Sequence, residues 1–266
     1  MELNGRVAVI TGGGSGIGAA LARAFAAAGA AHVAVADIDG AAAGAVAAEI
    51  AGSSFTLDAA DAGAVAAMVE EVAGAHGPID LFCANAGIAT AGDVDSDGDV
   101  WQRTWEVNVM SQVYAARAVL PAMLARGEGY LVLTASAAGL TTSLEAAPYA
   151  VTKHAAVALA EWLAITYGDR GIRVSCLAPQ FVDTPMGRAA MTTPAAAAWV
   201  QGMMIGPDEV AVAVVDGLRQ ERFLILPHPE VAGHFRNKAD DYDRWLAGMR
   251  KLRAGLGGPS FESPAP

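Results

Sequence analysis

The chain has 266 residues, 54% of them hydrophobic, and a formal net charge of -11 at pH 7. That length suffices for one sizeable core, so we expect a single domain over residues 1–256, followed by a disordered tail over residues 257–266. A chain this acidic lacks the basic patch that nucleic-acid binding needs. Its two separate cysteines and five scattered histidines do not form the cluster that a metal site requires.

The start of the chain bears on its location in the cell. Residues 1–6 lack the basic start and the apolar run of a signal peptide, which predicts a cytoplasmic protein. Two long uncharged stretches, residues 129–144 and 189–207, are interrupted by Gly, Ser, Thr or Pro. We therefore expect no membrane span.

A glycine-rich turn follows the first predicted strand. Residues 6–11 form a β-branched run that leads into residues 12–18 (GGGSGIG) and then into an alanine-rich helical stretch. A strand, a glycine-rich turn and a helix in this order are typical of dinucleotide-binding sites. Gly12 and Gly16 would let the backbone turn tightly beside a pyrophosphate, and Gly18 would let the helix pack closely on the strand. The start of the helix would offer free N–H groups to the anion.

Asp37 follows the second predicted strand, residues 32–36, and lies nineteen residues after Gly18. An acidic side chain there can accept hydrogen bonds from the adenosine ribose hydroxyls and would repel a 2′-phosphate, which favours NAD over NADP. The glycine turn contains no Arg or Lys, and Ile38 rather than a basic residue comes next, which supports the same choice. The alternative is that Asp37 caps the following helix, although Asp39 is placed equally well for that role.

Helices and strands continue to alternate, with helical patterns at residues 40–50 and 61–76 and strands at residues 53–57 and 79–84. This alternation predicts right-handed βαβ units and therefore an α/β fold, a Rossmann-like doubly wound parallel sheet of seven strands with helices on both faces. In such sheets ligands bind at the carboxyl ends of the strands. Four polar residues fall at those ends: Thr11, Asp37, Asp58 and Asn85.

Tyr149 and Lys153 open a long helical run that ends near residue 167, shortly after the fifth predicted strand, residues 129–135. Four residues apart on a helix, they present a phenol and an ammonium to the same side. A tyrosine, whose pKa is ordinarily about 10, transfers protons at neutral pH only where a nearby cation stabilises its phenolate. Taken alone, the pair is equally compatible with an ordinary amphipathic helix.

The remaining predicted elements are a helix over residues 101–125, strands at residues 171–178 and 223–226, and a charged helical extension over residues 230–253. The first of these helices contains Asn108. Asparagine is locally unfavourable inside a helix because its amide competes for backbone hydrogen bonds. A polar residue on a solvated helix face is the simplest interpretation of that position.

Several motifs together resemble the short-chain dehydrogenase/reductase family, in its single-domain, NAD-preferring branch. They are residues 11–18 (TGGGSGIG), Asn85-Ala86-Gly87, Asn108, Ser136 and the Tyr149–Lys153 pair, which begins thirteen residues after Ser136. The resemblance covers about residues 5–226, and the combination is far more specific than any single motif.

The resemblance implies a catalytic set of Asn108, Ser136, Tyr149 and Lys153. Tyr149 would transfer the hydroxyl proton, Ser136 would position the substrate oxygen, and Lys153 would lower the phenol pKa and hold the ribose. Asn108 would mark a helix distortion whose freed carbonyl holds a water in a proton relay. Cofactor contacts, with Asp58 on the adenine, would come from Thr11, Gly12, Ser15, Gly16, Ile17, Gly18, Asp37, Ile38, Asp58, Asn85, Ala86, Gly87, Tyr149, Lys153, Pro179, Val182 and Thr184.

The resemblance also implies a lid over the active site, at residues 185–206, where flexible methionine side chains suit an adaptable apolar pocket. Ordinary helix core is the alternative. The pocket would be lined by Ile88, Leu140, Leu144, Gln180, Met186 and Met191. Gln180 departs from the family pattern, which has Gly after the proline. Because Gly permits backbone angles that Gln resists, this change could alter the loop, or it could place an amide near the substrate.

We therefore expect a cytoplasmic enzyme that interconverts a secondary alcohol and a ketone with NAD. Its substrate would be a small hydrophobic alcohol or ketone, with no nucleic-acid or membrane partner, and the resemblance implies a homotetramer or a homodimer. One alternative is an NADP-linked carbonyl or acyl reductase, which would normally carry a basic residue near the glycine turn. The other is a non-catalytic, NAD-binding regulatory protein on the same fold.

Overall fold

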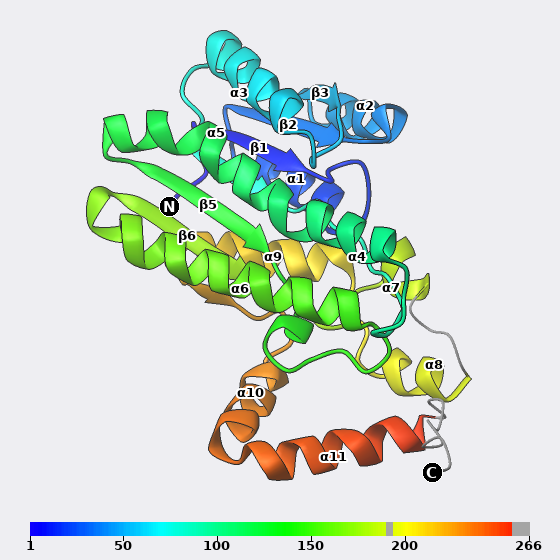
Figure 1. Cartoon of the computed structure of the whole chain (residues 1–266). Helices are drawn as coiled ribbons and strands as arrows, with labels where there is room; N and C mark the ends of the chain where they lie inside the picture. Colours follow the sequence, from blue (N-terminus) through cyan, green and yellow to red (C-terminus); the bar gives the residue numbers. More distant parts are fainter. Residues whose placement is uncertain (190–193, 257–266) are drawn as a thin grey trace.

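A parallel sheet of seven strands forms the centre of the computed structural model, which describes residues 1–189 and 194–256 (Figure 1). The strand order is β3-β2-β1-β4-β5-β6-β7, and every pairing is parallel. This confirms the predicted Rossmann-like, doubly wound fold. The strands are β1 (Val7–Thr11), β2 (His32–Asp37), β3 (Ser53–Thr56), β4 (Leu81–Ala84), β5 (Gly129–Thr134), β6 (Ile172–Leu177) and β7 (Leu224–Ile225).

Two hydrophobic cores lie on the two faces of the sheet. Alternate side chains of β1 enter different cores, Val7 and Val9 one of them and Ala8 and Ile10 the other, as the two-residue period of a strand requires. The first core packs under α3 (Ala62–His76), α5 (Ser111–Arg126) and α6 (Ala147–Tyr167), and the second under α1 (Gly16–Ala27), α2 (Gly40–Glu49) and α9 (Pro207–Arg219).

Helix α9 lies outside the elements predicted from the sequence. Its start carries recognisable signals, because Pro207 occupies the first turn and the Glu209 carboxylate accepts a hydrogen bond from Gly206 N at 2.8 Å. Val210, Val214 and Leu218 then recur every four residues and are fully buried. This spacing is typical of a helix with one face on the core.

The helix predicted over residues 101–125 is interrupted. It consists of α4 (Gly98–Trp105), a π-helical turn at Glu106–Met110 and α5. In the π-helical turn, Ser111 N–H reaches Glu106 O, five residues earlier, while the Ser111 hydroxyl donates to Val107 O at 2.5 Å. The turn contains Asn108, where the family resemblance places a distortion.

The C-terminal extension forms two helices where one was predicted. They are α10 (Glu230–Asp240) and α11 (Tyr242–Gly255), which lie together beside the loop before α6 (Figure 1). The prediction of a single helix is wrong because Asp241 adopts extended backbone angles. Its carboxylate accepts a hydrogen bond from Arg244 N at 2.9 Å and so caps a new helix. The predicted lid segment contains α7 (Pro185–Ala189) and α8 (Pro194–Gln201).

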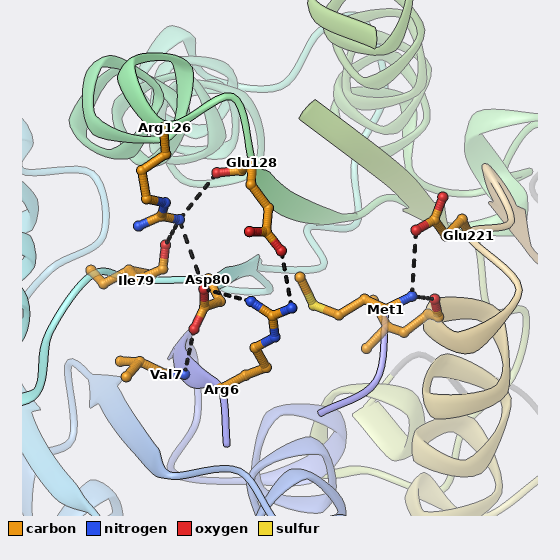
Figure 2. A network of polar contacts seen from close by, with 9 residues as sticks. Met1, Arg6, Val7, Ile79, Asp80, Arg126, Glu128 and Glu221 are labelled. Atoms are coloured by element: carbon orange, nitrogen blue, oxygen red, sulfur yellow. Dashed lines mark hydrogen bonds and ion pairs between the residues drawn. The ribbon is translucent and has the colours of Figure 1, made fainter. Parts of the chain in front are cut away.

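A polar network ties the amino ends of β1, β4 and β5 together, at the opposite end of the strands from the predicted site (Figure 2). The Asp80 carboxylate lies 3.2 Å from Arg6 Nη1 and accepts from Val7 N at 3.0 Å. Arg6 Nη2 also lies 3.0 Å from Glu128, and Arg126 donates to Ile79 O. These contacts fix the base of the sheet.

Two sequence-based expectations concern residues outside this description, the pocket residue Met191 and the tail 257–266. No helix of the described part of the chain has both the length and the apolar composition needed to cross a bilayer.

Candidate active site

The glycine-rich turn adopts the backbone that its sequence predicts. Gly12 and Gly16 have φ values of +65° and +50°, in the left-handed region that side chains disfavour. A Cβ added to Gly18 would lie 2.0 Å from Gly12 O, so the helix can approach the strand only with glycine there. The turn is therefore built for tight backbone packing.

The start of α1 is available to an anion. Ser15 is the N-cap residue, its side chain makes no capping hydrogen bond, and the residue is exposed. Helix N-termini offer N–H donors and a favourable dipole to negative charge. A pyrophosphate fits this position chemically.

Asp37 lies against the glycine turn. Its Oδ2 accepts from Gly14 N at 2.9 Å and its Oδ1 from Asp39 N at 3.0 Å. Asp39, not Asp37, caps α2 by accepting from Ala42 N, so the capping alternative is wrong. The neighbouring Ile38 is 66% exposed, which leaves an apolar surface beside the carboxylate.

Asp58 has a partner that the sequence did not suggest. Its Oδ1 accepts from Ala60 N at 2.9 Å, and its Oδ2 lies 2.8 Å from Arg103 Nη2 on α4. The two residues are far apart in sequence, so no local pattern reveals the pair. An adenine contact at Asp58 would share the carboxylate with this guanidinium.

Asn85 links the central strands. Its Nδ2 donates to Thr11 O and Gly12 O, both at 3.2 Å, and its backbone N–H donates to Thr11 Oγ1 at 3.1 Å. A Cβ added to Gly87 would lie 3.2 Å from Asn108 Oδ1 and 3.3 Å from Lys153 Nζ. The Asn85–Gly87 turn thus brings the glycine turn and the predicted catalytic residues together.

Asn108 is completely buried, so the solvated-face interpretation is wrong. Its Oδ1 accepts from Ile88 N at 2.8 Å, and its Nδ2 donates to Ile88 O at 2.9 Å and to Thr152 Oγ1 at 3.1 Å. The side chain therefore holds the loop that follows β4 against α6. Its amide is fully used in these bonds, which leaves only the backbone for a relay.

Ser136 and Tyr149 lie close enough for the serine side chain to affect the phenol. Burial raises the pKa of Tyr149, and the Ser136 side chain acts in the opposite direction. Ser136 Oγ also accepts from Ala138 N at 3.1 Å and lies 3.4 Å from Pro179 O. The two predicted catalytic hydroxyls, separated by thirteen residues, thus meet in space.

Lys153 is buried beneath the phenol. Its Nζ donates to Thr134 O at 3.0 Å and lies 5.6 Å from the centre of the Tyr149 ring. Burial lowers the pKa of Lys153 to about 8, which leaves most molecules charged at pH 7. This ammonium favours ionisation of the tyrosine.

The loop after β6 lies close to the glycine turn. Pro179 O accepts from Ala137 N at 2.8 Å, which fixes the loop beside Ser136. A Cβ added to Gly16 would lie 3.0 Å from Thr184 Cγ2, while Val182 is buried and pairs with Ile205. The predicted cofactor residues of this loop therefore adjoin those of the turn.

His228 was missed by sequence reasoning. It is 2% exposed, its Nδ1 accepts from Gln180 N at 3.2 Å, and its Nε2 lies 3.1 Å from both Phe181 O and Met203 O. Because an amide N–H only donates and a carbonyl only accepts, the ring is neutral with its proton on Nε2. The only sequence signal was its place between two prolines.

The six predicted pocket residues are less uniform. Leu140 is buried in the core, Met186 is 40% exposed, and Ile88, Leu144 and Gln180 are half-buried. Gln180 Oε1 is buried and accepts no hydrogen bond from the described residues. Leu140 instead lines a cavity of about 250 Å³ between α6 and α10.

Comparisons with known proteins agree with this geometry. The short chain dehydrogenase family model matches residues 6–195. The 1-deoxy-11-beta-hydroxypentalenate dehydrogenase of Streptomyces exfoliatus is 34% identical over 264 residues, 93% of this chain and 92% of that enzyme. The D-threitol dehydrogenase of Mycolicibacterium smegmatis is 34% identical over 224 residues, 80% of this chain and 86% of that enzyme.

A solved structure is similarly close. A short chain dehydrogenase/reductase from Burkholderia phymatum, in complex with NAD, matches with a TM-score of 0.83 and 30% identity, over 92% of this chain and 96% of that chain. Together with the family model, this shows that the chain belongs to the short-chain dehydrogenase/reductase family.

Proposed function

We propose that the protein is a NAD-dependent dehydrogenase that interconverts a secondary alcohol and a ketone. The observation that carries this proposal is the convergence of Ser136, Tyr149 and Lys153. The Ser136 side chain lowers the pKa of the Tyr149 phenol, and the buried ammonium lies 5.6 Å from the phenol ring. Relatives that act on hydroxyl groups support the coarser class, an oxidoreductase of CH–OH groups.

The residues around the glycine turn fit a dinucleotide. The turn lacks the side chains that would fill its bends, Ser15 leaves the start of α1 open, and Asp37 presents a carboxylate to ribose hydroxyls. The negative charge of Asp37 supports NAD over NADP. When bound, the nicotinamide supplies the hydride acceptor or donor.

Each polar residue of the site then has a role in handling the substrate oxygen and its proton. Ser136 donates a hydrogen bond that fixes the oxygen, and Tyr149 takes the hydroxyl proton during oxidation or returns it during reduction. Since burial raises the pKa of Tyr149, the phenolate needs the positive charge of Lys153. Asn108 holds the loop after β4 against α6, which positions both partners.

The predicted pocket residues favour a hydrophobic substrate. Ile88 N donates to Asn108 Oδ1, Leu144 precedes Tyr149 in sequence, and Met186 places an exposed side chain in the segment proposed as a lid. We propose a secondary alcohol with an apolar frame.

Assembly of several copies is also part of the proposal. Helix α6 exposes Val151, Trp162 and Ile165, at 49%, 55% and 82%, and their spacing places them on one face. This supports a homotetramer or a homodimer. Light scattering on the purified protein tests it, and a monomer at micromolar concentration would contradict it.

The test of the function is NADH formation with secondary alcohols. We expect turnover with 1-phenylethanol or cyclohexanol, and a loss of about 10²-fold or more in Tyr149→Phe, the scale typical of a lost acid–base group. Tyr167→Phe, at the other end of α6, is the matched control and should keep full activity. Full activity in Tyr149→Phe would refute the mechanism.

A further inference from the structure

The C-terminal extension contacts the loop that connects Ser136 to Tyr149. Lys238, on α10, donates from Nζ to Leu140 O at 2.8 Å. Arg253, on α11, lies with Nε 3.0 Å from the Glu145 carboxylate. Two charged residues of the extension therefore contact the loop, residues 137–146, near its two ends.

The contact through Lys238 is buried. The residue is 9% exposed, its Nζ lies 3.3 Å from His154 Nε2, and the ammonium is 5.5 Å from the centre of the Tyr242 ring. His154 Nδ1 lies 2.8 Å from Ala150 O, a carbonyl that can only accept, so Nδ1 carries the proton and Nε2 is free to accept from the lysine. A buried ammonium is tolerated only with such partners.

A cavity lies beside these polar contacts. It has a volume of about 250 Å³, lies between α6 and α10, and is lined by Leu140, His154, Phe235, Lys238 and Tyr242, among others. Apolar side chains around a cavity lack part of the dispersion contact that would hold them in place. The Leu140 side chain is buried in the core, and the hydrogen bond from Lys238 adds to that packing by fixing the Leu140 carbonyl.

We propose that Lys238 and Arg253 are positioning residues that hold loop 137–146 in place and so set the substrate-facing wall of the active site. The proposal rests on the proposed function only for its catalytic consequence. Because the loop adjoins Ser136 and Tyr149 and contributes none of the residues assigned to the dinucleotide, loosening it affects the alcohol and spares the cofactor.

The first experiment measures amide hydrogen exchange in the full chain, which needs no substrate. Lys238→Met keeps the side-chain length, and the cavity accommodates its thioether. We expect exchange in peptides covering residues 139–146 to accelerate about tenfold or more, while peptides of the glycine turn and the Kd for NADH stay within about twofold. Lys251→Met, an exposed lysine on α11, is the control and should leave exchange unchanged.

The second pair of variants uses a half-buried arginine and an exposed glutamate, where the risk to folding is lower than at the buried Lys238. Arg253→Gln and Glu145→Gln should each accelerate exchange of the same loop by about threefold, since each removes the ion pair between the two side chains. Arg250→Gln, exposed on the same helix, is the control. Unchanged loop exchange in Lys238→Met and in Arg253→Gln overturns the proposal.

Kinetics then separate positioning from a purely structural effect. With 1-phenylethanol, Lys238→Met should raise KM for the alcohol about tenfold and leave kcat and KM for NAD within about twofold. A merely destabilised enzyme would lose active molecules and lower kcat instead. If the protein oxidises no alcohol, the proposed function fails, and the exchange measurements still decide whether the loop is held by the extension.

Discussion

Gln112 and Lys153 donate hydrogen bonds to the same backbone oxygen, Thr134 O, at 3.1 and 3.0 Å. Gln112 is completely buried, and its Oε1 has no partner among the described residues. A buried acceptor without a partner costs about 1–3 kcal/mol. The floor of the active site therefore contains a destabilising group directly beside the catalytic lysine.

Replacing this amide should stabilise the fold. Gln112→Met removes the unpartnered oxygen at similar volume. It also removes the bond from Nε2, but Thr134 O keeps its bond from Lys153, so we expect the free energy of unfolding to rise by about 1 kcal/mol. Urea denaturation measures the change. Gln102→Met, on α4 with its amide bonded to Glu106 at the surface, is the control and should change little. A loss of stability in Gln112→Met would contradict the view that the amide is a net cost to the fold.

Asp37 should determine the choice between the two dinucleotides. Asp37→Ser removes the carboxylate that repels a 2′-phosphate, so the ratio of kcat/KM for NAD over NADP should fall about tenfold or more. Asp39→Ser is the matched control, because Asp39 caps α2 and should affect stability but not preference. A ratio unchanged in Asp37→Ser would remove the case for NAD selectivity.

Lys153 should make stability depend on alkaline pH. Burial lowers the pKa of Lys153 from 10.5 to about 8. Between these two pH values the unfolded chain binds more protons than the folded chain, so the free energy of unfolding increases with rising pH. The contribution is lost as pH falls through about 8. Cys83 and Cys176, whose pKa values burial raises, give the opposite slope at alkaline pH, so wild type must be compared with a variant.

The comparison uses Lys153→Met, which keeps both cysteines. Denaturation at several pH values should show the difference in unfolding free energy between the two proteins moving by about 2 kcal/mol in favour of wild type between about pH 8 and pH 10. Parallel pH curves for the two proteins would mean that the ammonium is not desolvated.

His32 should make stability depend on acid pH in the same direction. Burial, and then the nearby His76, lower the pKa of His32, and the two rings stack 3.4 Å apart. The folded chain therefore resists protonation, and the associated stability is present above about pH 6.5 and lost as pH falls below it. His32→Gln should reduce the dependence of the melting temperature on pH below about pH 6.5. His234→Gln, on α10, serves as the control, and an unchanged acid slope in His32→Gln would contradict the assignment.

Asp80 should matter for stability alone. It holds Arg6 and Val7 N at the base of the sheet, with 13% of its side chain exposed (Figure 2). Asp80→Asn should cost about 2 kcal/mol, and Glu128→Gln, at a 55% exposed partner, less than about 1 kcal/mol. Kinetic constants should be unchanged in both variants because the network lies far from the carboxyl ends of the strands. A selective loss of activity would show coupling along the strands.

The parts of the site that the sequence predicted are those set by local geometry. The glycine turn needs positive φ at Gly12 and Gly16, and Tyr149 and Lys153 need only one turn of helix between them. Such requirements appear as residue types at fixed spacing. The parallel sheet could be predicted for a similar reason, because alternating strands and helices are compatible with few topologies.

The unpredicted parts depend on approach between distant segments. Arg103 reaches Asp58 across 45 residues, and Lys238 reaches Leu140 across 98. No periodicity connects such pairs, because the contact depends on how whole helices pack. The break at Asp241 is different, since an aspartate placed to cap a helix is a local signal that the sequence prediction did not use.

His228 has a mechanical consequence. One neutral imidazole bonds to Gln180 and Phe181 after β6 and to Met203 before α9. Withdrawing the ring releases both segments in the same event. Separation of these two segments is therefore cooperative, and they should gain or lose order as one unit.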